Sequence, residues 1–452
     1  MRQVTGDEYE QALSWIHSTV RFGSKLGLER IRRLMVLLGN PERECEYVHV
    51  AGTNGKGSVT AMVASALQAN GCRTGRYVSP YLEDFRERIV LGNEMISPAD
   101  LVCLVNAVKP QVEAMVSEGG EHPTEFEIVT AAALYYYAKK RCDYVALEVG
   151  LGGRFDATNV VTPAASVITT ISFDHTERLG TSLSEIAFEK AGIIKPGVPV
   201  ITGVAEEEPL QVIRKRADDL GSLLFTVSNA RRADVTWEEV SYSMESQVIN
   251  VKGPGFLYEN VTVPLLGRHQ QHNAALAIAA LEFGRPRNRL GKFRLDRAAV
   301  KHGIASTKWP GRLEVLSRKP TIILDGAHNP EGAKALSEAV QSFPRKRVVC
   351  VLGMLGDKSF KEAAGLIAPI CDEVIVTSPD TPRALNPDIL ADEARRYTAS
   401  VEVEPDLRKA VDIALSKASA DDMVLACGSL YLVGPIRSYL SSKLGMSGSS
   451  VT

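Results

Sequence analysis

The sequence lacks any long uninterrupted apolar run and has almost no excess of charge of either sign. No stretch of about 18 apolar residues occurs, which excludes an ordinary transmembrane helix. The 452-residue chain carries 52 Lys and Arg against 54 Asp and Glu, a net charge of −2. This balance gives no support for nucleic acid or an anionic membrane as a main partner. Because the polar N-terminus lacks the apolar core of a signal peptide, we expect a cytoplasmic protein.

Cysteine is scarce, and its spacing is not typical of a disulfide framework. The seven cysteines are odd in number and scattered, and no Cys-x-x-Cys spacing occurs. Reduced thiols in the core are therefore expected. The hydrophobic content of 45% and charged content of 23% are near the average for globular proteins. A chain of this length is expected to form about two or three domains.

The segment AGTNGKGS, residues 51–58, lies between a predicted strand at 47–51 and a predicted helix at 59–69. Its glycines allow a tight turn that points backbone N–H groups inward. The helix N-terminus adds the positive end of its dipole, and Lys56 can reach terminal phosphates. This order of strand, glycine-rich turn and helix is typical of a phosphate-binding loop (P-loop). The alternative is an ordinary glycine-rich turn.

The match to the common P-loop pattern is imperfect. Val50 stands where the first glycine is expected, and Gly57 stands directly after the lysine, where Ser or Thr is expected. A hydroxyl group from Thr53 or Ser58 could still lie near a magnesium ion.

Apolar strands and helices alternate along most of the chain. The predicted strand at 144–149 lacks polar alternation, which is typical of a parallel sheet covered on both faces. Other strands of this domain are predicted at 74–79, 167–172 and 198–202. Helices are predicted between them, at 98–117, 128–137 and 184–191. This alternation predicts an α/β fold with right-handed crossovers. Residues 222–265 differ, because their strand-like, Gly- and Pro-punctuated pattern predicts a small antiparallel sheet.

Trp309-Pro310-Gly311 interrupts the pattern and predicts a domain boundary. We therefore expect one domain over residues 1–308 and a smaller α/β domain over residues 309–452. The second domain is of ordinary size. Its predicted strands lie at 321–324, 347–352, 373–377 and 423–427.

Several polar residues directly follow apolar strands in the first domain. Ser79, Glu148 and the pair Asp174-His175 are expected to meet at the carboxyl edge of the sheet, where α/β proteins bind ligands. A hydroxyl, a carboxylate and an imidazole beside a phosphate loop could hold magnesium, although magnesium prefers oxygen ligands. The alternatives are a Glu148 carboxylate paired with Arg154 and a His175 that is only hydrogen-bonded at its strand end.

A second polar cluster follows the first strand of the predicted second domain. Asp325, His328 and Asn329 precede Pro330 there. This pattern could be a simple Asx turn, but so many polar groups at a strand end also suggest a functional site. Arg312, at the hinge between the domains, could reach a phosphate in the first domain.

Six segments in order resemble folylpolyglutamate synthases of the Mur ligase superfamily, which are ATP-dependent amide-forming ligases. They are GTNGKGS, SPYLEDFRERI, LEVGLGGRFDATN, FDHTERLG with FEKAGIIKPG, LDGAHNP and GSLYLVG. The resemblance spans residues 20–437. The P-loop of these enzymes departs from the common pattern in the same way as AGTNGKGS. The resemblance implies a Mur-ligase-like P-loop ATPase domain over residues 1–308 and a Rossmann-like glutamate-ligase domain over residues 309–452.

The resemblance also assigns roles by position. It implies ATP contacts from Asn54, Gly55, Lys56, Gly57, Asn273, Arg312 and Asp325. It implies magnesium ligands at Ser79, Glu148 and His175, with or without a further monovalent cation. Lys190 matches a lysine that is carbamylated in the family, and Lys56, Lys190 and His175 are the expected catalytic residues. His328 lies in the same motif as Asp325 and is expected to support its site.

Three separate segments match the pterin-side pocket of bifunctional members. The matching residues are Leu28, Glu29, Arg30, Thr124, Glu125, Phe126, Glu127, Phe155, Asp156 and Ala157. Their presence favours a bifunctional enzyme that adds L-glutamate to dihydropteroate and to folates through an acyl phosphate. A monofunctional folylpolyglutamate synthase is the close alternative. A non-catalytic nucleotide-binding regulator is disfavoured because Lys56, Glu148, His175 and Lys190 are all retained. A monomer is expected.

Overall fold

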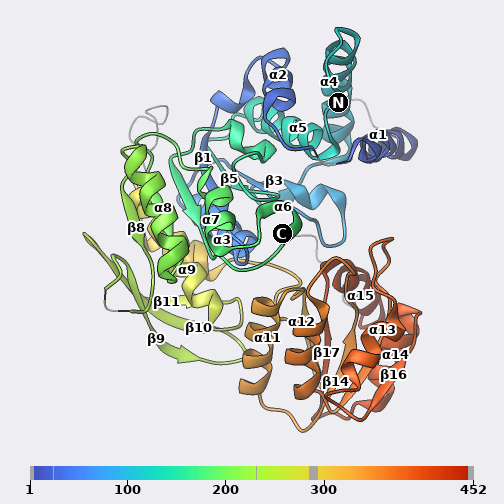
Figure 1. Cartoon of the computed structure of the whole chain (residues 1–452). Coiled ribbons are helices and arrows are strands. Elements are labelled where there is room, and N and C mark those ends of the chain that lie inside the picture. The colour runs from blue at the N-terminus through green and yellow to red at the C-terminus, as the bar shows by residue number, and fades with distance from the viewer. Residues whose placement is uncertain (1–4, 24, 231, 285–293, 446–452) are drawn as a thin grey trace.

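The computed structural model describes residues 5–23, 25–230, 232–284 and 294–445 (Figure 1). Its largest sheet has eight strands in the order β4-β3-β2-β5-β1-β6-β7-β8. All neighbouring strands are parallel except the pairs β2–β3 and β3–β4. The strands are β1 Glu46–Ala51, β2 Thr74–Tyr77, β3 Ile89–Leu91, β4 Glu94–Met95, β5 Tyr144–Glu148, β6 Ala165–Ile168, β7 Val200–Thr202 and β8 Leu224–Thr226.

Helices cover both faces of this sheet, since alternate residues of its central strands enter different cores. Val48 and Val50 of β1 pack with one helix group, whereas Tyr47 packs with the other. The first group is α3 Lys56–Ala69, α9 His269–Phe283 and α10 Arg297–Ala305. The second group is α1 Gly6–Ser18, α2 Glu29–Leu37, α4 Pro98–Ser117 and α5 Glu125–Lys139, with α7 Leu183–Ala191 and α8 Glu207–Asp219 over the later strands.

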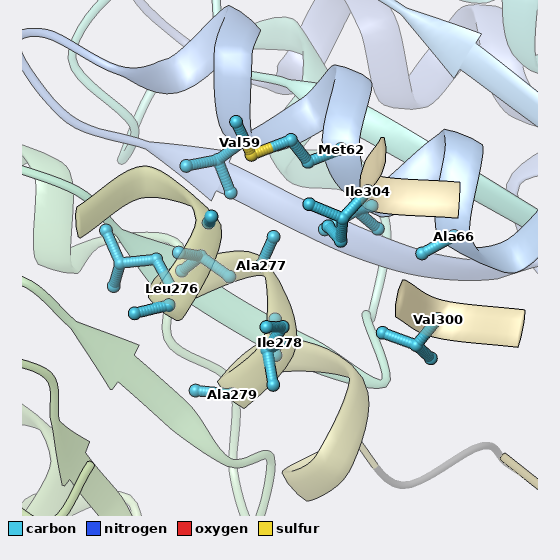
Figure 2. Packing of buried hydrophobic residues seen from close by; sticks show 14 of the residues in the cluster. Val59, Met62, Ala66, Leu276, Ala277, Ile278, Ala279, Val300 and Ile304 are labelled. Atoms are coloured by element: carbon cyan, nitrogen blue, oxygen red, sulfur yellow. The ribbon is translucent and has the colours of Figure 1, made fainter. Parts of the chain in front are cut away.

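The first helix group forms a dense interior. Figure 2 shows Val59, Met62 and Ala66 of α3 facing the side chains of α9 and α10. An antiparallel sheet packs into the same core, in the order β11-β10-β9. Its strands are β9 Thr236–Tyr242, β10 Gln247–Gly253 and β11 Phe256–Val263. Residues 58–64 of α3 are all buried, so the loop before this helix is attached to a packed core.

A third sheet, of six strands, begins after the predicted boundary, in the order β12-β13-β17-β14-β15-β16. Only β12 is antiparallel to its neighbour. The strands are β12 Glu314–Arg318, β13 Thr321–Asp325, β14 Val348–Leu352, β15 Glu373–Val376, β16 Val401–Val403 and β17 Met423–Cys427. Helices α11 Pro330–Ser342, α12 Phe360–Ile367 and α13 Pro387–Ala394 cover one face, and α14 Leu407–Lys417 and α15 Leu430–Lys443 cover the other.

The structure confirms the predicted α/β class and corrects two details. Leu224–Thr226, expected in the antiparallel sheet, joins the large sheet as a parallel edge strand. The strand expected at 167–172 already ends at Ile168. All seven cysteines are free, and only Cys103 is exposed. Among the described helices, none is both long and apolar enough to cross a membrane. The exact domain boundary stays a prediction.

Candidate active site

A cavity of about 330 Å³ lies where the carboxyl ends of strands from both parallel sheets meet. The phosphate loop follows β1, and the loops after β2, β5 and β6 surround it. Residues after β13, β14 and β17 face it from the third sheet. Every residue predicted for ATP, metal or catalysis lines this cavity: Asn54, Gly55, Lys56, Gly57, Ser79, Glu148, His175, Lys190, Asn273, Arg312 and Asp325.

The phosphate loop has a shape that only glycine allows. Gly52 and Gly55 have φ values of 149° and 85°. A Cβ atom on Gly52 would overlap the Thr169 side chain, and one on Gly55 would lie 2.5 Å from Asn273 Oδ1. Lys56 begins α3, and its Nζ donates to the carbonyl oxygens of Gly52 and Thr53, each at 3.0 Å. The ammonium group is therefore held against the loop itself.

Lys190 brings a second amine to the same loop. It lies in the last turn of α7 and is only 4% exposed, and its Nζ donates to the Gly52 carbonyl at 2.8 Å. Burial, together with the positive charge of Lys56, lowers the pKa of Lys190 to about 7. A substantial fraction of this amine is therefore neutral near pH 7.

Glu148 is the last residue of β5 and its carboxylate is buried, with 5% exposure. The backbone N–H of Ser79 donates to Glu148 Oε2 at 3.4 Å. Burial raises the pKa of Glu148 to about 7, against the opposing positive charges of Lys56 and Arg312. Arg154 pairs with Glu189 at 2.6 Å instead, so the alternative interpretation of a Glu148–Arg154 pair is wrong.

His175 lies beyond the strand end, at the start of the short helix α6 Thr176–Leu179. Its Nε2 is 2.9 Å from Lys358 Nζ, and Lys358 also pairs with Asp174 at 2.7 Å. Burial lowers the pKa of His175 to about 4, so the imidazole is neutral near pH 7. Burial opposes ionisation of Asp174, but the nearby Lys358 holds its pKa well below the usual range.

Lys358 lines the cavity, although the sequence analysis did not select it. It follows β14 and its side chain is only 6% exposed, although it crosses to Asp174 on the first sheet's side. One sequence feature could have identified Lys358: it lies in a polar segment after an apolar strand, and a position at such a strand end also pointed to Glu148. Arg383, Ser429 and Tyr431 also line this side of the cavity.

Asp325 ends β13 and is 7% exposed. It accepts hydrogen bonds from the backbone N–H groups of Leu313 and Ala327, both at 2.8 Å. The second bond forms an Asx turn, which confirms the simple turn considered as one interpretation of this motif. Asp325 also lines the cavity. Burial raises the pKa of Asp325, and Arg312 opposes this shift.

Direct hydrogen bonds join the phosphate loop to the third sheet's helix α11. Asn329 caps α11 and its amide donates to Asn54 Oδ1 at 3.0 Å. The Asn54 amide in turn donates to Glu331 Oε2 at 2.6 Å. The two halves of the cavity are therefore in contact at the loop itself.

None of the ten residues predicted for the pterin side lines this cavity; all ten are described. They lie in a neighbouring region where α2, α5 and the 3-10 helix Ala157–Val160 contact one another. Several have clear structural roles. Arg30 pairs with the buried Glu127, and Glu127 and Thr124 cap α5 reciprocally. Asp156 caps the 3-10 helix and accepts from the Leu151 N–H.

The two regions meet at Gly150. Gly150 lines the cavity, and a Cβ atom there would lie 2.5 Å from the ring of Phe126. Phe155 is 36% exposed, and the Arg154 guanidinium lies 4.2 Å from its ring centroid. Leu28 and Ala157 are buried in the helix core. The pterin-side residues therefore form a separate wall that adjoins the cavity along one loop.

The donor atoms in the cavity partly fit a magnesium ion. Among the described residues, no three His, Cys, Asp or Glu side chains are grouped as an all-protein metal site. The Ser79 hydroxyl and Glu148 carboxylate are hard oxygen donors of the kind that suits Mg²⁺, which commonly keeps waters and substrate phosphates as its other ligands. His175 fits less well, since its Nε2 contacts Lys358.

Comparisons with known proteins agree with this geometry. Residues 50–281 match the Mur ligase middle domain, and residues 311–430 match the Mur ligase glutamate ligase domain. A Bacillus subtilis dihydrofolate synthase/folylpolyglutamate synthase is 39% identical over 96% of this chain and 99% of its own length.

Two solved structures share the fold over nearly the whole chain. Mycobacterium tuberculosis folylpolyglutamate synthase complexed with ADP has a TM-score of 0.88 and 33% identity, covering 95% of this chain and 98% of that chain. Escherichia coli FolC in complex with DHPP and ADP has a TM-score of 0.85 and 30% identity, covering 96% and 98%. The chain therefore belongs to the Mur ligase family, in its group of dihydrofolate synthases and folylpolyglutamate synthases.

Proposed function

We propose that this chain is an ATP-dependent ligase that adds L-glutamate to dihydropteroate, making dihydrofolate, and to folyl-glutamates, making folylpolyglutamate. The observation that carries the proposal is the shared cavity, in which Lys56 of the phosphate loop is faced by Arg312 and Asp325. The Bacillus subtilis relative is named for both activities, which supports a bifunctional enzyme. Cytoplasmic location and a monomeric state remain part of this proposal.

The proposed reaction has two chemical steps. A carboxylate oxygen of the acceptor attacks the γ-phosphorus of ATP, so that an acyl phosphate forms and ADP leaves. The neutral amine of glutamate then attacks the acyl carbon, and inorganic phosphate leaves. Lys56 and Arg312 would stabilise the negative charge on the transferred phosphoryl group. The two halves of the cavity would orient both reactants and keep water from the acyl phosphate.

We assign Ser79 and Glu148 as the proposed magnesium ligands. The pKa of Glu148 near 7 reflects burial that the positive charges of Lys56 and Arg312 offset only in part, an environment that a divalent cation would satisfy. When bound, the ion would neutralise charge on the phosphate oxygens. His175 remains a weaker candidate ligand because it contacts Lys358.

We also propose that Lys190 is carbamylated. Its buried, partly neutral Nζ can attack carbon dioxide, forming an N–C bond and releasing a proton to give a carbamate anion. Lys56 lies close enough to depress the pKa of Lys190 and could pair with that anion. The change would replace two neighbouring cations at the Gly52 carbonyl with an ion pair, which is electrostatically favourable.

The wall formed by α2, α5 and residues 155–157 is the proposed site for the acceptor's ring system. Phe155 offers a half-exposed aromatic face, and Gly150 links this wall to the cavity. On the third sheet, Lys358 and Arg383 are cations that could recognise the carboxylates of glutamate. The acceptor carboxylate and the glutamate amine would then meet beside Lys56.

The proposal is tested by incubating the purified chain with ATP, magnesium, carbon-14 L-glutamate and either dihydropteroate or tetrahydrofolate. We expect labelled amide product with each acceptor. Product with tetrahydrofolate alone would rule out the proposed dihydrofolate synthase activity. No labelled product with either acceptor, in a sample that binds ADP, would overturn the ligase proposal.

A further inference from the structure

A second cavity, of about 400 Å³, lies apart from the proposed active site, between α3, the β3–β4 turn and the end of α10. It shares no lining residue with the first cavity. Three lining residues are basic, none of the described lining residues is acidic, and others offer hydroxyl or amide groups. The polar lining includes Gln68, Arg76, Asn93, His302, Ser306 and Lys308.

Arg76 is the central charge of this cavity. It lies in β2, and its Nε is buried without a hydrogen-bond partner. Within the described chain, no carboxylate forms an ion pair with the Arg76 guanidinium. The contact that the structure does provide is the Trp309 ring, whose centroid lies 5.3 Å from the guanidinium carbon. One face of the cation is therefore covered by an aromatic ring, and its buried Nε–H group lacks an acceptor.

This arrangement is energetically costly without a ligand. An arginine stays protonated even when buried. The Nε–H group is buried without an acceptor, and the carboxylates of Glu87 and Glu148 attract the guanidinium without forming an ion pair with it. A negatively charged ligand would satisfy the unpaired N–H group and remove most of this cost.

The walls of the cavity are held in place by close helix packing. Ser65 Oγ of α3 donates to the Gly303 carbonyl of α10 at 2.6 Å. Gly303 lies directly against the backbone of Ala66, so a side chain there would clash. Figure 2 shows the neighbouring crossing of α3 and α10 at Ala66 and Ile304. The cavity is thus a feature of two packed helices and a tight turn.

We propose that this second cavity is a binding site for a small multivalent anion, a phosphate ester or a polycarboxylate, with Arg76 as its central contact. The planar guanidinium suits either oxyanion, and Lys308 adds a second positive charge to the lining. The side-chain amides of Asn93 and Gln68 can donate further hydrogen bonds. The volume is in the range that holds metabolite-sized ligands.

The site adjoins the phosphate loop through one side chain. A Cβ atom on Gly57 would lie 2.5 Å from Trp309 Cζ2, and Trp309 is the ring that covers Arg76. An anion could therefore be mistaken for one bound at the phosphate loop, and the test must separate the two sites.

The test is isothermal titration calorimetry of the full chain, saturated with ADP, using inorganic phosphate and citrate as probes at constant ionic strength. Two variants change the second cavity: Arg76→Gln removes the cation, and Asn93→Asp adds a carboxylate at an exposed turn. Two controls leave it intact: Asn229→Asp makes the same charge change at an exposed position outside the cavity lining, and Lys56→Ala alters the phosphate loop.

We expect at least one probe to bind with a dissociation constant that rises roughly tenfold or more in both cavity variants, since a charged hydrogen bond contributes about 1.5–3 kcal/mol. The two controls should stay within about twofold of the wild type. Binding of phosphate alone would identify a phosphate ester as the ligand class, and binding of citrate alone a polycarboxylate.

Three results would overturn the proposal. One is the absence of saturable binding of both probes at millimolar concentrations. Another is binding that survives in Asn93→Asp and Arg76→Gln. The third is binding lost in Lys56→Ala, which would place the anion at the phosphate loop. If Arg76→Gln does not fold, Asn93→Asp alone decides, because its side chain is exposed.

Discussion

Two lysine side chains donate to one carbonyl oxygen, that of Gly52. Lys56 approaches it from the start of α3 and Lys190 from the end of α7. Burial is the main cause of the depressed pKa of Lys190, and the repulsion between two ammonium groups so close adds to it. Carbamylation of Lys190 would turn the repulsion into attraction, whereas Lys56 must stay a cation to bind phosphate.

The first prediction separates these two roles. Lys190→Ala should lower ligase activity by roughly a hundredfold or more, and added formate or acetate should restore part of it by supplying the missing anion. Lys56→Ala should have no ligase activity. Formate and acetate should not restore it, because they supply an anion whereas this variant lacks a cation. Activity would be measured by glutamate incorporation across a formate series. Failure of the carboxylates to rescue Lys190→Ala would count against the carbamate.

The second prediction concerns His49, a fully buried residue of β1 whose Nε2 lies 2.8 Å from Thr158 Oγ1. Burial lowers the pKa of His49 from its usual 6.5 to about 3. Below pH 6.5 the unfolded chain therefore takes up a proton that the folded chain does not. This contribution makes the free energy of unfolding fall as pH decreases from 6.5 toward 3, by about 1.4 kcal/mol per pH unit.

His49→Gln, which does not titrate, should lose stability less steeply than the wild type over this pH window. Urea unfolding at pH 7, 6 and 5 would measure both slopes. Equal slopes for the two proteins would mean that His49 is protonated in the folded state.

At the scale of elements, the phosphate loop joins β1 to α3 in a shape fixed by two left-handed glycines. Gly55→Ala should strain the backbone and push against Asn273, lowering stability by about 1–3 kcal/mol and weakening ADP binding. Gly6→Ala is the matched control, because that glycine has open space around it. Thermal unfolding and ADP titration would test both variants. ADP binding equal to wild type in Gly55→Ala would contradict the assigned geometry.

The sequence predicted most of the long elements, because their hydrophobic patterns are strong and their ends carry clear signals. The helix expected at 98–117 is α4, with the same bounds, and Ser97 caps it. The edge strands β8, β12 and β16 did not stand out from loops or were assigned to the wrong sheet. They have three to five residues and are only partly buried, so their apolar pattern is weak.

The candidate site was predictable where a residue follows a strong strand, as Glu148 and Asp325 do. Pairings between side chains were not predictable. Arg154 was weighed as a partner of Glu148, but α7 brings Glu189 to it instead. Lys358 reaches Asp174 from a position 184 residues further along the chain. Such contacts depend on how the two parallel sheets face each other, which local sequence does not encode.

At the scale of the whole molecule, the two large sheets lie in separate halves (Figure 1), and residues that follow strands of both line the shared cavity. Hydrogen bonds and ion pairs join the two halves of the molecule at separate points. Asn54 contacts α11, Asp174 contacts Lys358, and Arg437 of α15 pairs with Glu83 at 2.6 Å. Arg437 also pairs with Glu314 at 3.0 Å, so it ties the start of the third sheet to the loop after β2.

A double-mutant cycle on Glu83 and Arg437 tests this bridge. Because both side chains are about one-fifth to one-quarter exposed, we expect Arg437→Ala to lower stability by roughly 1–2 kcal/mol. The coupling with Glu83→Ala should be on the order of 1 kcal/mol. Urea unfolding of the four proteins gives the cycle. A coupling indistinguishable from zero would mean that this pair does not help to hold the two parts together.

The central claim is that the shared cavity activates an acceptor carboxylate by transferring the γ-phosphoryl group of ATP to it. The direct measurement uses dihydropteroate labelled with oxygen-18 in its carboxylate, together with ATP, magnesium and L-glutamate, followed by mass spectrometry of the released phosphate. We predict one labelled oxygen in each phosphate released per amide bond formed. Amide product accompanied by unlabelled phosphate would contradict the account.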